Sequence, residues 1–441
     1  MKGFAGIPSH WKISRIDRVA TVNARIGWKA LTAAEYQDEG FAFLSTPNIK
    51  NAKIDFENVN YISEFRYRES PELQLAKGDV LLTKDGFTLG TVNVVRDLPR
   101  PATVNGSIAV LRPFAIHPVF LQYVIASSIT QDSIQAVKDG MDVLHLFQRD
   151  IKKLEIPLPD TEEQQRIANF LDTETARIDS LATDRVRQRA VLEERSYAEV
   201  SESLLPGILT GARGNRPWHW LPDIPTGSPL VRLGYICRLQ NGLTVDGKRD
   251  VNGDAVKRPY LRVANVQAGY VNLTNVTEII IPRNIARRCT LRPGDVLMTE
   301  GGDLDKLGRG TVWNGEIPDC LHQNHVFALR PEPDRLDGDY LALMTQTMHG
   351  RCYFESTGSK TTNLASTNSS KILSFPIPLP PVSRQRELVH GVHTKLDVIR
   401  RTKHSLDRQL ALLAERRQAL ITTAVTGQID VSTASGRGVE D

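Results

Sequence analysis

The chain has 441 residues, of which 40% are hydrophobic and 24% charged, as in an ordinary globular protein with room for two or more domains. Its formal net charge of +4, from 55 basic and 51 acidic residues, permits nucleic-acid binding through local patches and does not require it. Apolar runs stay well below the roughly 18 residues of a membrane span, and the N-terminus has no apolar signal core, so we expect a cytoplasmic protein.

The first domain is expected to be a mixed β domain that ends near Leu158. Short apolar runs at 79–83, 91–95 and 107–111 alternate with glycines and prolines, which is typical of strands joined by exposed loops. Lys77-Gly78-Asp79 predicts a tight turn that leads into a strand.

A long helix is predicted after Pro159. Thr161 and Gln164 fit a capping box, and proline does not recur until Pro206. About 44 residues of helix would span about 65 Å.

The second half of the chain repeats the first half. FLSTPNIKNAKIDFENVNYIS from Phe43 returns as YLRVANVQAGYVNLTNVTEII from Tyr260, an offset of 217 residues. LAKGDVLLTKDG, AVLRP and EIPLPDTEEQQR return as LRPGDVLMTEGG, FALRP and PIPLPPVSRQRE, and the offset stays between 216 and 221. We therefore expect one domain pattern, duplicated, with a second long helix that has Ser383 as its N-cap and ends near Val425, before Gly427.

The second helix carries a seven-residue apolar repeat, and the first helix carries a weaker one that Arg185 interrupts. Segment 161–200 has six basic and nine acidic residues, whereas segment 383–420 has nine basic and four acidic. The opposite net charges favour packing of the two helices on each other within one chain; the alternative is a homodimer through the second helix. The predicted fold is α+β: two duplicated mixed-β domains linked by two long helices that form an antiparallel intramolecular coiled coil. The expected boundaries are 1–158, 159–210, 211–380 and 381–441.

The order of domain, helix, domain, helix, with the IPLP…EEQQRI and IPLP…RQREL openings, resembles the specificity subunit of a type I restriction–modification system. Trp11-Lys12-Ile13 is similar to the usual opening of such a domain, whereas Pro229-Leu230-Val231 stands where a second tryptophan would be expected.

The resemblance implies a non-catalytic protein that reads double-stranded DNA as two half-sites, one for each target-recognition domain. It implies that the helices set the gap between half-sites and dock two adenine methyltransferase subunits, joined by restriction subunits that translocate DNA. S-adenosylmethionine, ATP and magnesium are then expected on those partners and not on this chain.

The sequence lacks the motifs that nucleotide hydrolysis or methyl transfer would require, in agreement with this reading. The chain has no GxxxxGK[ST] phosphate loop and no Asn/Asp-Pro-Pro-Tyr/Phe methyltransferase element. The His322–His325 and His390–His393 spacings lack a carboxylate or thiol set, and the widely spaced cysteines form no CxxC pair, so we expect no metal site.

Candidate DNA-contacting residues lie in polar loops, because base edges are read by side chains with hydrogen-bonding groups. The loops after each GDVL strand and before each Pro-x-Pro step supply most of them, with ordinary loop drift as the alternative. The candidates are Lys29, Lys84, Thr88, Lys138, Lys306, Arg309, Lys360, Thr361 and Asn363.

Residues of the long helices are the candidates for docking partner subunits. They are Gln164, Ile178, Leu192, Ile399, Leu406 and Leu413. Two other functions remain open at this stage: a coiled-coil adaptor that binds only proteins, and a diverged fused nuclease or methyltransferase.

Overall fold

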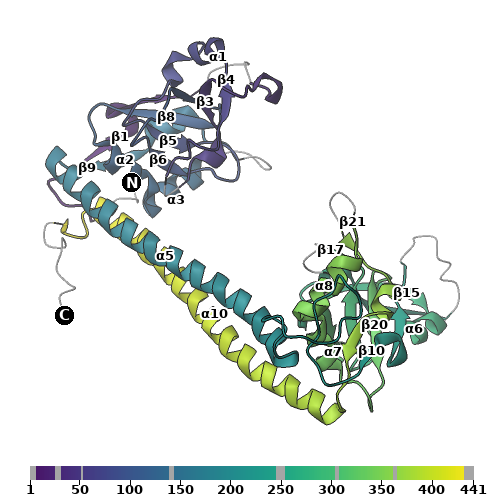
Figure 1. The fold of residues 1–441 in the computed structure, drawn as a ribbon. Helices are drawn as coiled ribbons and strands as arrows, with labels where there is room; N and C mark the ends of the chain where they lie inside the picture. The colour runs from purple at the N-terminus through teal and green to yellow at the C-terminus, as the bar shows by residue number, and fades with distance from the viewer. Residues whose placement is uncertain are drawn as a thin grey trace, which may run out of the picture. The chain divides into compact units, whose positions relative to one another are not determined.

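A computed structural model describes residues 6–24, 31–50, 53–138, 144–244, 254–302, 307–360 and 365–431, with the backbone alone for Lys360. The chain forms two compact units, each of which takes part of both long helices (Figure 1). Unit 1 comprises Met1–Val186 and Asp407–Asp441, and unit 2 comprises Arg187–Leu406.

Unit 1 is built on three small sheets. The largest sheet, of four strands, has the order β2 (Ala20–Asn23), β8 (Ile108–Pro113), β5 (Val80–Thr83), β6 (Val92–Val94). A second sheet has the order β4 (Asn60–Ile62), β3 (Phe41–Leu44), β7 (Ala102–Val104), and a third pairs β1 (Lys12–Arg15) with β9 (Glu155–Leu158). The helices of this unit are α1 (Glu64–Arg68), α2 (Pro118–Ala126), α3 (Ser128–Val137) and α4 (Gln148–Lys153).

Unit 2 repeats this arrangement strand for strand. Its larger sheet has the order β11 (Cys237–Asn241), β20 (Val326–Pro331), β16 (Val296–Thr299), β18 (Gly310–Val312). The sheet β15 (Thr277–Pro282), β12 (Ala255–Leu261), β19 (Leu321–His322) corresponds to β4-β3-β7, and β10 (Leu230–Arg232) with β23 (Pro376–Pro378) corresponds to β1 with β9. The outer pair, β3 with β7 or β12 with β19, is parallel in both units. The duplication predicted from the sequence is therefore confirmed as a duplication of the fold.

Unit 2 also has strands without a counterpart among the named strands of unit 1. They are β13 (Val266–Gln267) with β14 (Tyr270–Val271), and the small sheet β17 (Gly301–Gly302), β22 (Ala365–Ser366), β21 (Ser359–Lys360). Its helices are α6 (Arg283–Cys289), α7 (Gly338–Gln346), α8 (Met348–Thr357) and α9 (Ser369–Leu373).

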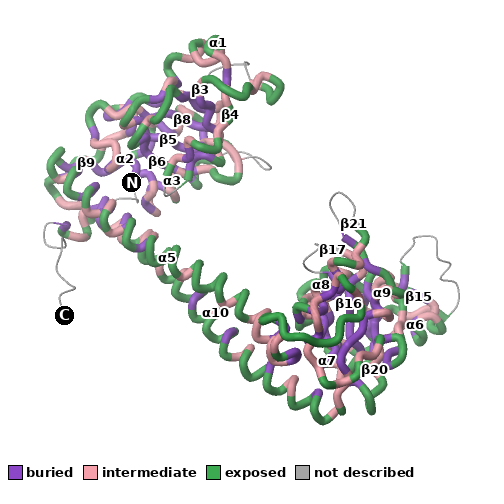
Figure 2. The backbone as a smooth tube through the Cα atoms, viewed as in Figure 1, coloured by how far each residue is buried: buried purple, intermediate pink, exposed green. Residues whose placement is uncertain are grey.

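The central strands read as continuous apolar runs because both of their faces are covered. In β5, Val80 and Leu82 join one apolar cluster with α2, while Leu81 joins a second cluster with β3 and β7. Val296 and Leu297 of β16 divide in the same way in unit 2. Figure 2 shows these strands buried in both units.

The long helices are α5 (Thr161–Leu204) and α10 (Val382–Val425), which have the lengths predicted from the sequence. The predicted caps are wrong by one or two residues. The side chain of Asp160 accepts the hydrogen bond from the backbone N–H of Glu163, so Thr161 is already helical, and α10 begins at Val382, before Ser383. Gly427, with φ of 72°, follows the end of α10 as expected.

The two helices run antiparallel within each unit. In unit 2, Lys403 pairs with Glu193 and Lys395 Nζ lies 2.5 Å from Glu199 Oε1; in unit 1, Arg417 Nε lies 2.9 Å from Asp179 Oδ1. The basic side chains come from α10 and the acidic side chains from α5, as their net charges predicted. The intramolecular coiled coil is confirmed.

Each helix start is joined to the β-rich domain before it by a buried glutamine. Gln164 Oε1 accepts from the backbone N–H of His117 at 2.7 Å, while its Nε2 donates to the carbonyl of Pro159 at 2.8 Å. Gln385 repeats this with the N–H of Asp337 and the carbonyl of Pro380. The glutamine that looked like part of a cap thus fixes the helix to the domain.

Each domain also contacts the end of the other helix. In unit 1 the backbone N–H of Ser128 donates to Thr422 Oγ1 of α10, and in unit 2 the N–H of Met348 donates to Ser201 Oγ of α5. A domain is therefore held between the start of one helix and the end of the other.

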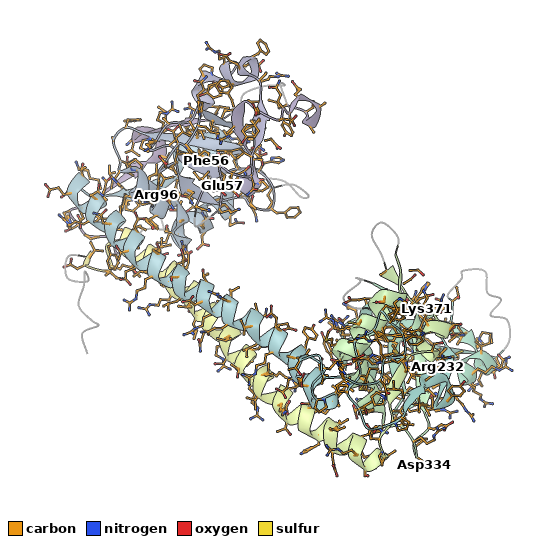
Figure 3. All side chains as sticks on the ribbon, viewed as in Figure 1. Phe56, Glu57, Arg96, Arg232, Asp334 and Lys371 are labelled. Atoms are coloured by element: carbon orange, nitrogen blue, oxygen red, sulfur yellow. The ribbon has the colours of Figure 1, made fainter. Side chains whose placement is uncertain are left out.

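Further contacts strengthen this junction in unit 1. Arg96, labelled in Figure 3, makes two hydrogen bonds of 2.7 Å to Asp172 of α5, and this partner raises the pKa of Arg96. Trp11 Nε1 donates to Glu163 Oε2 at 2.9 Å. The tryptophan that opens the first domain therefore ties that domain to the start of α5. Within the part of the chain that the structure describes, no helix is both long and apolar enough to cross a membrane.

Candidate nucleic-acid interface

Three loops of unit 1 that are far apart in sequence meet beyond the end of β5. The backbone N–H of Lys84 donates to the carbonyl of Ser107, and Leu146 N–H donates to the carbonyl of Lys84. Gly86 N–H donates to the carbonyl of Leu144. The loop after the GDVL strand and the loop before the Pro-x-Pro step, both predicted as DNA-contacting, thus lie side by side.

The side chains at this meeting point form a small charged cluster. Asp85 accepts from Lys84 Nζ at 2.7 Å and pairs with His145 Nδ1 at 2.9 Å. Lys84 is mostly buried, at 18% side-chain exposure, because Asp85 holds it against the loop. Thr88 is exposed, and Lys138 is exposed with its Nζ 2.6 Å from Gln135 Oε1. Thr88 and Lys138 are therefore accessible to solvent, and Lys84 has less of its surface available.

Unit 2 brings the corresponding loops together. Glu300 N–H donates to the carbonyl of His325 at 2.8 Å, and Thr367 N–H donates to the carbonyl of Glu300 at 2.7 Å. Glu300 Oε2 also lies 2.5 Å from His325 Nδ1. Because β17 pairs with β22 and β22 with β21, the loop after β16 and the loop before β23 share a sheet.

The two clusters occupy matching places and differ in chemistry. Unit 1 has Lys84, Asp85 and His145, whereas unit 2 has Glu300 and His325 at its corresponding point. Similar scaffolds with different loop side chains suit two surfaces that contact different ligands.

Several predicted contact residues lie outside the description. Lys29, Lys306, Thr361 and Asn363 are not among the described residues, nor is the side chain of Lys360, whose backbone belongs to β21. Their roles stay predictions.

Arg309 lies against a helix. Its guanidinium is 5.8 Å from the centre of the Tyr197 ring of α5, and Arg351 approaches the same ring at 4.9 Å. The loop that carries Arg309 is therefore in contact with α5, a relationship that residues 112 positions apart do not reveal in the sequence.

The predicted docking residues are largely occupied inside the chain. Gln164, Ile178, Ile399 and Leu406 are buried, and Leu192 and Leu413 are half-buried. Apolar side chains with 41% to 63% exposure lie elsewhere on the helices: Leu181, Val186 and Val191 on α5, and Val398 and Leu412 on α10. The heptad count missed these five, because it selects the seam that the two helices use for each other.

Burial shifts the pKa values of two ionisable side chains in unit 2. Burial lowers the pKa of His322, whose Nδ1 lies 2.6 Å from the carbonyl oxygen of Val326. Burial also raises the pKa of the Cys237 thiol to about 12. Among the described residues, no group of three His, Cys, Asp or Glu side chains is arranged to hold a metal ion.

Comparisons with known proteins agree with this arrangement. Residues 8–186 match the family described as "Type I restriction modification DNA specificity domain". The chain is 22% identical over 431 residues to the type I restriction enzyme EcoKI specificity subunit of Escherichia coli K12, covering 96% of this chain and 90% of that protein. It is also 22% identical to the StySPI specificity subunit of Salmonella potsdam, with the same coverage.

Solved structures share the fold. A chain from a study of complex assembly and conformational transition of the type I R-M system superposes with a TM-score of 0.71 at 19% identity, covering 96% of this chain and 99% of that one. The HsdS subunit of Thermoanaerobacter tengcongensis gives a TM-score of 0.50 at 20% identity, covering 96% and 98%.

Duplicated α+β units on paired long helices are thus the fold that this chain shares with these solved structures. Residues 8–186 thus match a type I restriction modification DNA specificity domain, and nearly the whole chain is similar to specificity subunits of type I restriction enzymes.

Proposed function

We propose that the chain reads a split DNA target, with one half-site bound by the loop cluster of each unit. The observation that carries this proposal is the repeat of the strand order in the two units, combined with loop clusters of different chemistry. Two linked reading surfaces also raise the effective concentration of the second contact, so moderate half-site affinities give a selective whole.

Within each unit the rigid part is the sheet, and the readers are loop side chains. Thr88 and Lys138 are the accessible candidates in unit 1, and Lys306, Lys360, Thr361 and Asn363 are the candidates in unit 2. Hydroxyl, amide and ammonium groups of this kind donate to phosphates and base edges. Phosphate contacts would fix the register, and base contacts would select the sequence.

The long helices are proposed to set the gap between the half-sites and to dock two adenine methyltransferase subunits and the restriction subunits, in the cytoplasm. S-adenosylmethionine, ATP and magnesium would be bound by those subunits. The exposed apolar side chains of α5 and α10 support a docking surface, because burying them against another chain is favourable.

The test is a map of adenine methylation by long-read sequencing in cells that carry the partner methyltransferase, with and without this chain. A split motif with a fixed gap, found only with the chain, supports the proposal. Methylation that does not depend on the chain, or a motif with one continuous block, contradicts it.

A domain exchange then assigns each half-site. Replacing residues 1–158 with the corresponding domain of another specificity subunit should change one half of the motif and leave the other half intact. A change in both halves would show that the units do not read independently.

A further inference from the structure

Phe87 lies on the loop after β5, two residues beyond Asp85 of the charged cluster in unit 1. Its side chain is 101% exposed, the highest value among the large apolar side chains that the structure describes as exposed; Phe65, at 74%, is next. Single exposed apolar residues are common on protein surfaces and need no explanation by themselves. Phe87, however, lies on the loop after β5, which is predicted to contact DNA.

The loop presents the ring outward on a fixed backbone. Leu89 N–H donates to the carbonyl of Gly86 at 3.2 Å, which closes a four-residue turn with Phe87 at its first central position. Gly86 has φ of 85°, and Leu89 packs on the apolar core of the unit. The turn therefore partly buries Leu89 and leaves Phe87 in solvent.

One neighbouring loop and the hairpin's own strand hold this turn in place. The backbone bonds of Gly86 to Leu144 and of Gly90 to Thr83 are 2.9 and 2.8 Å long. Asp85, just before the turn, is fixed by Lys84 and His145. A turn tethered in this way loses little backbone freedom when its side chain meets a ligand, which favours tight contact.

Polar residues neighbour Phe87 along the chain and in the hydrogen-bonded loop beside it. Thr88 is exposed beside it in sequence, and the adjoining loop supplies His145, whose side chain is 47% exposed. An aromatic ring among hydrogen-bonding groups suits a DNA surface, where it contacts a thymine methyl or the face of a base while the polar groups contact phosphates and base edges.

We infer that Phe87 is a specificity-determining residue for one half-site, in apolar contact with the bases there. This inference rests on the proposed function. The aligned position in the repeat is Asp303, so the contact belongs to unit 1 and distinguishes its half-site from the other.

The experiment compares Phe87→Ala, Phe87→Trp and the control Phe65→Ala in the full chain with its methyltransferase. Motifs are mapped by long-read sequencing, and affinity for a duplex with the mapped target is measured from 50 to 200 mM salt. Phe87→Ala should reduce discrimination in one half-site at least tenfold and leave the other half-site unchanged. The slope of log affinity against log salt should not change, because an apolar contact releases no counterions.

Phe87→Trp should keep most of the discrimination, and Phe65→Ala should behave as wild type. Phe87→Ala with the wild-type motif and affinity overturns the inference. Loss of co-purification with the methyltransferase, with Phe87→Ala still folded by circular dichroism, also overturns it by assigning the ring to a protein contact. If wild type itself yields no split motif, the proposed function fails instead.

Discussion

Arg112 donates two hydrogen bonds of 2.8 Å to the carboxylate of Asp79, and Arg330 makes the same pair of bonds, at 2.7 Å, to Asp295. Both carboxylates are 1% exposed. The second oxygen of each carboxylate also accepts a backbone N–H three residues earlier, from Ala76 or Arg292. The repeated GDVL and LRP motifs are therefore the two halves of one ion pair, which joins the turn before the central strand to the adjacent strand.

Asp79→Asn should destabilise unit 1 by about 1.5–3 kcal/mol, because it weakens charged hydrogen bonds to a buried group. Denaturant unfolding measures this change. Asp97→Asn is the control: Asp97 pairs with Lys77 on the surface, with side chains 77% and 67% exposed, and its loss should have no measurable effect. Equal effects of the two substitutions would refute a structural role for the buried pair.

Gln385→Ala should cost at least about 2 kcal/mol in unfolding free energy, because buried backbone groups lose their partners. Gln164→Ala should cost less, because Gln385 makes one hydrogen bond more than Gln164, from Nε2 to the carbonyl of Arg335 at 2.9 Å. Gln165→Ala is the matched control, since the exposed Gln165 side chain donates to Asn169 on the same helix. An unchanged midpoint of denaturant unfolding for both Gln164→Ala and Gln385→Ala would show that these glutamines do not stabilise the link between helix and domain.

The stability of unit 2 should fall in mild acid because of His349. Burial lowers the pKa of this imidazole to about 4, and its Nε2 lies 2.7 Å from the carbonyl oxygen of Pro376. The unfolded chain, with a pKa near 6.5, binds the proton first, so stability is present above pH ~6.5 and is lost as pH falls toward about 4.

The loss attributable to His349 is at most about 3 kcal/mol. Urea unfolding of wild type and His349→Gln at pH 7.5, 6 and 5 measures it, because the stability difference between the two proteins should shrink toward low pH. The exposed His404, changed to Gln, serves as control and should track wild type. Parallel profiles for wild type and His349→Gln would contradict the assignment.

Removing seven residues from each long helix should shorten the gap in the DNA motif by about two or three base pairs. Seven residues of helix span about 10 Å, and base pairs are spaced about 3.4 Å apart. Segments 187–193 and 403–409 suit the deletion because Glu193 and Lys403 are partners and leave together. Methylation mapping reads the gap; both half-sites should stay the same, and an unchanged gap would count against the helices as spacers.

Much of the fold follows from the sequence. The short apolar runs of β5 and β16 predict strands, and the two helices end where the prolines and Gly427 indicated. The caps were misplaced because the box pattern does not show that Gln164 turns toward the domain, where the N–H of His117 lies.

Less of the site could be predicted. Composition identifies the loops after β5 and before β9 as candidates, but hydrogen bonds between residues such as Gly86 and Leu144 depend on tertiary folding. The same holds for Arg309, which meets Tyr197 only because β18 and α5 come together in unit 2.

The glutamine joints have a consequence for how new specificities arise. On the domain side, Gln164 and Gln385 bind main-chain groups: the N–H of His117 in one unit, and the N–H of Asp337 and the carbonyl of Arg335 in the other. Every amino acid except proline offers both of these groups. The side chains of a recognition domain can therefore diverge freely, or a whole domain can be exchanged by recombination, while the attachment to the helix stays compatible.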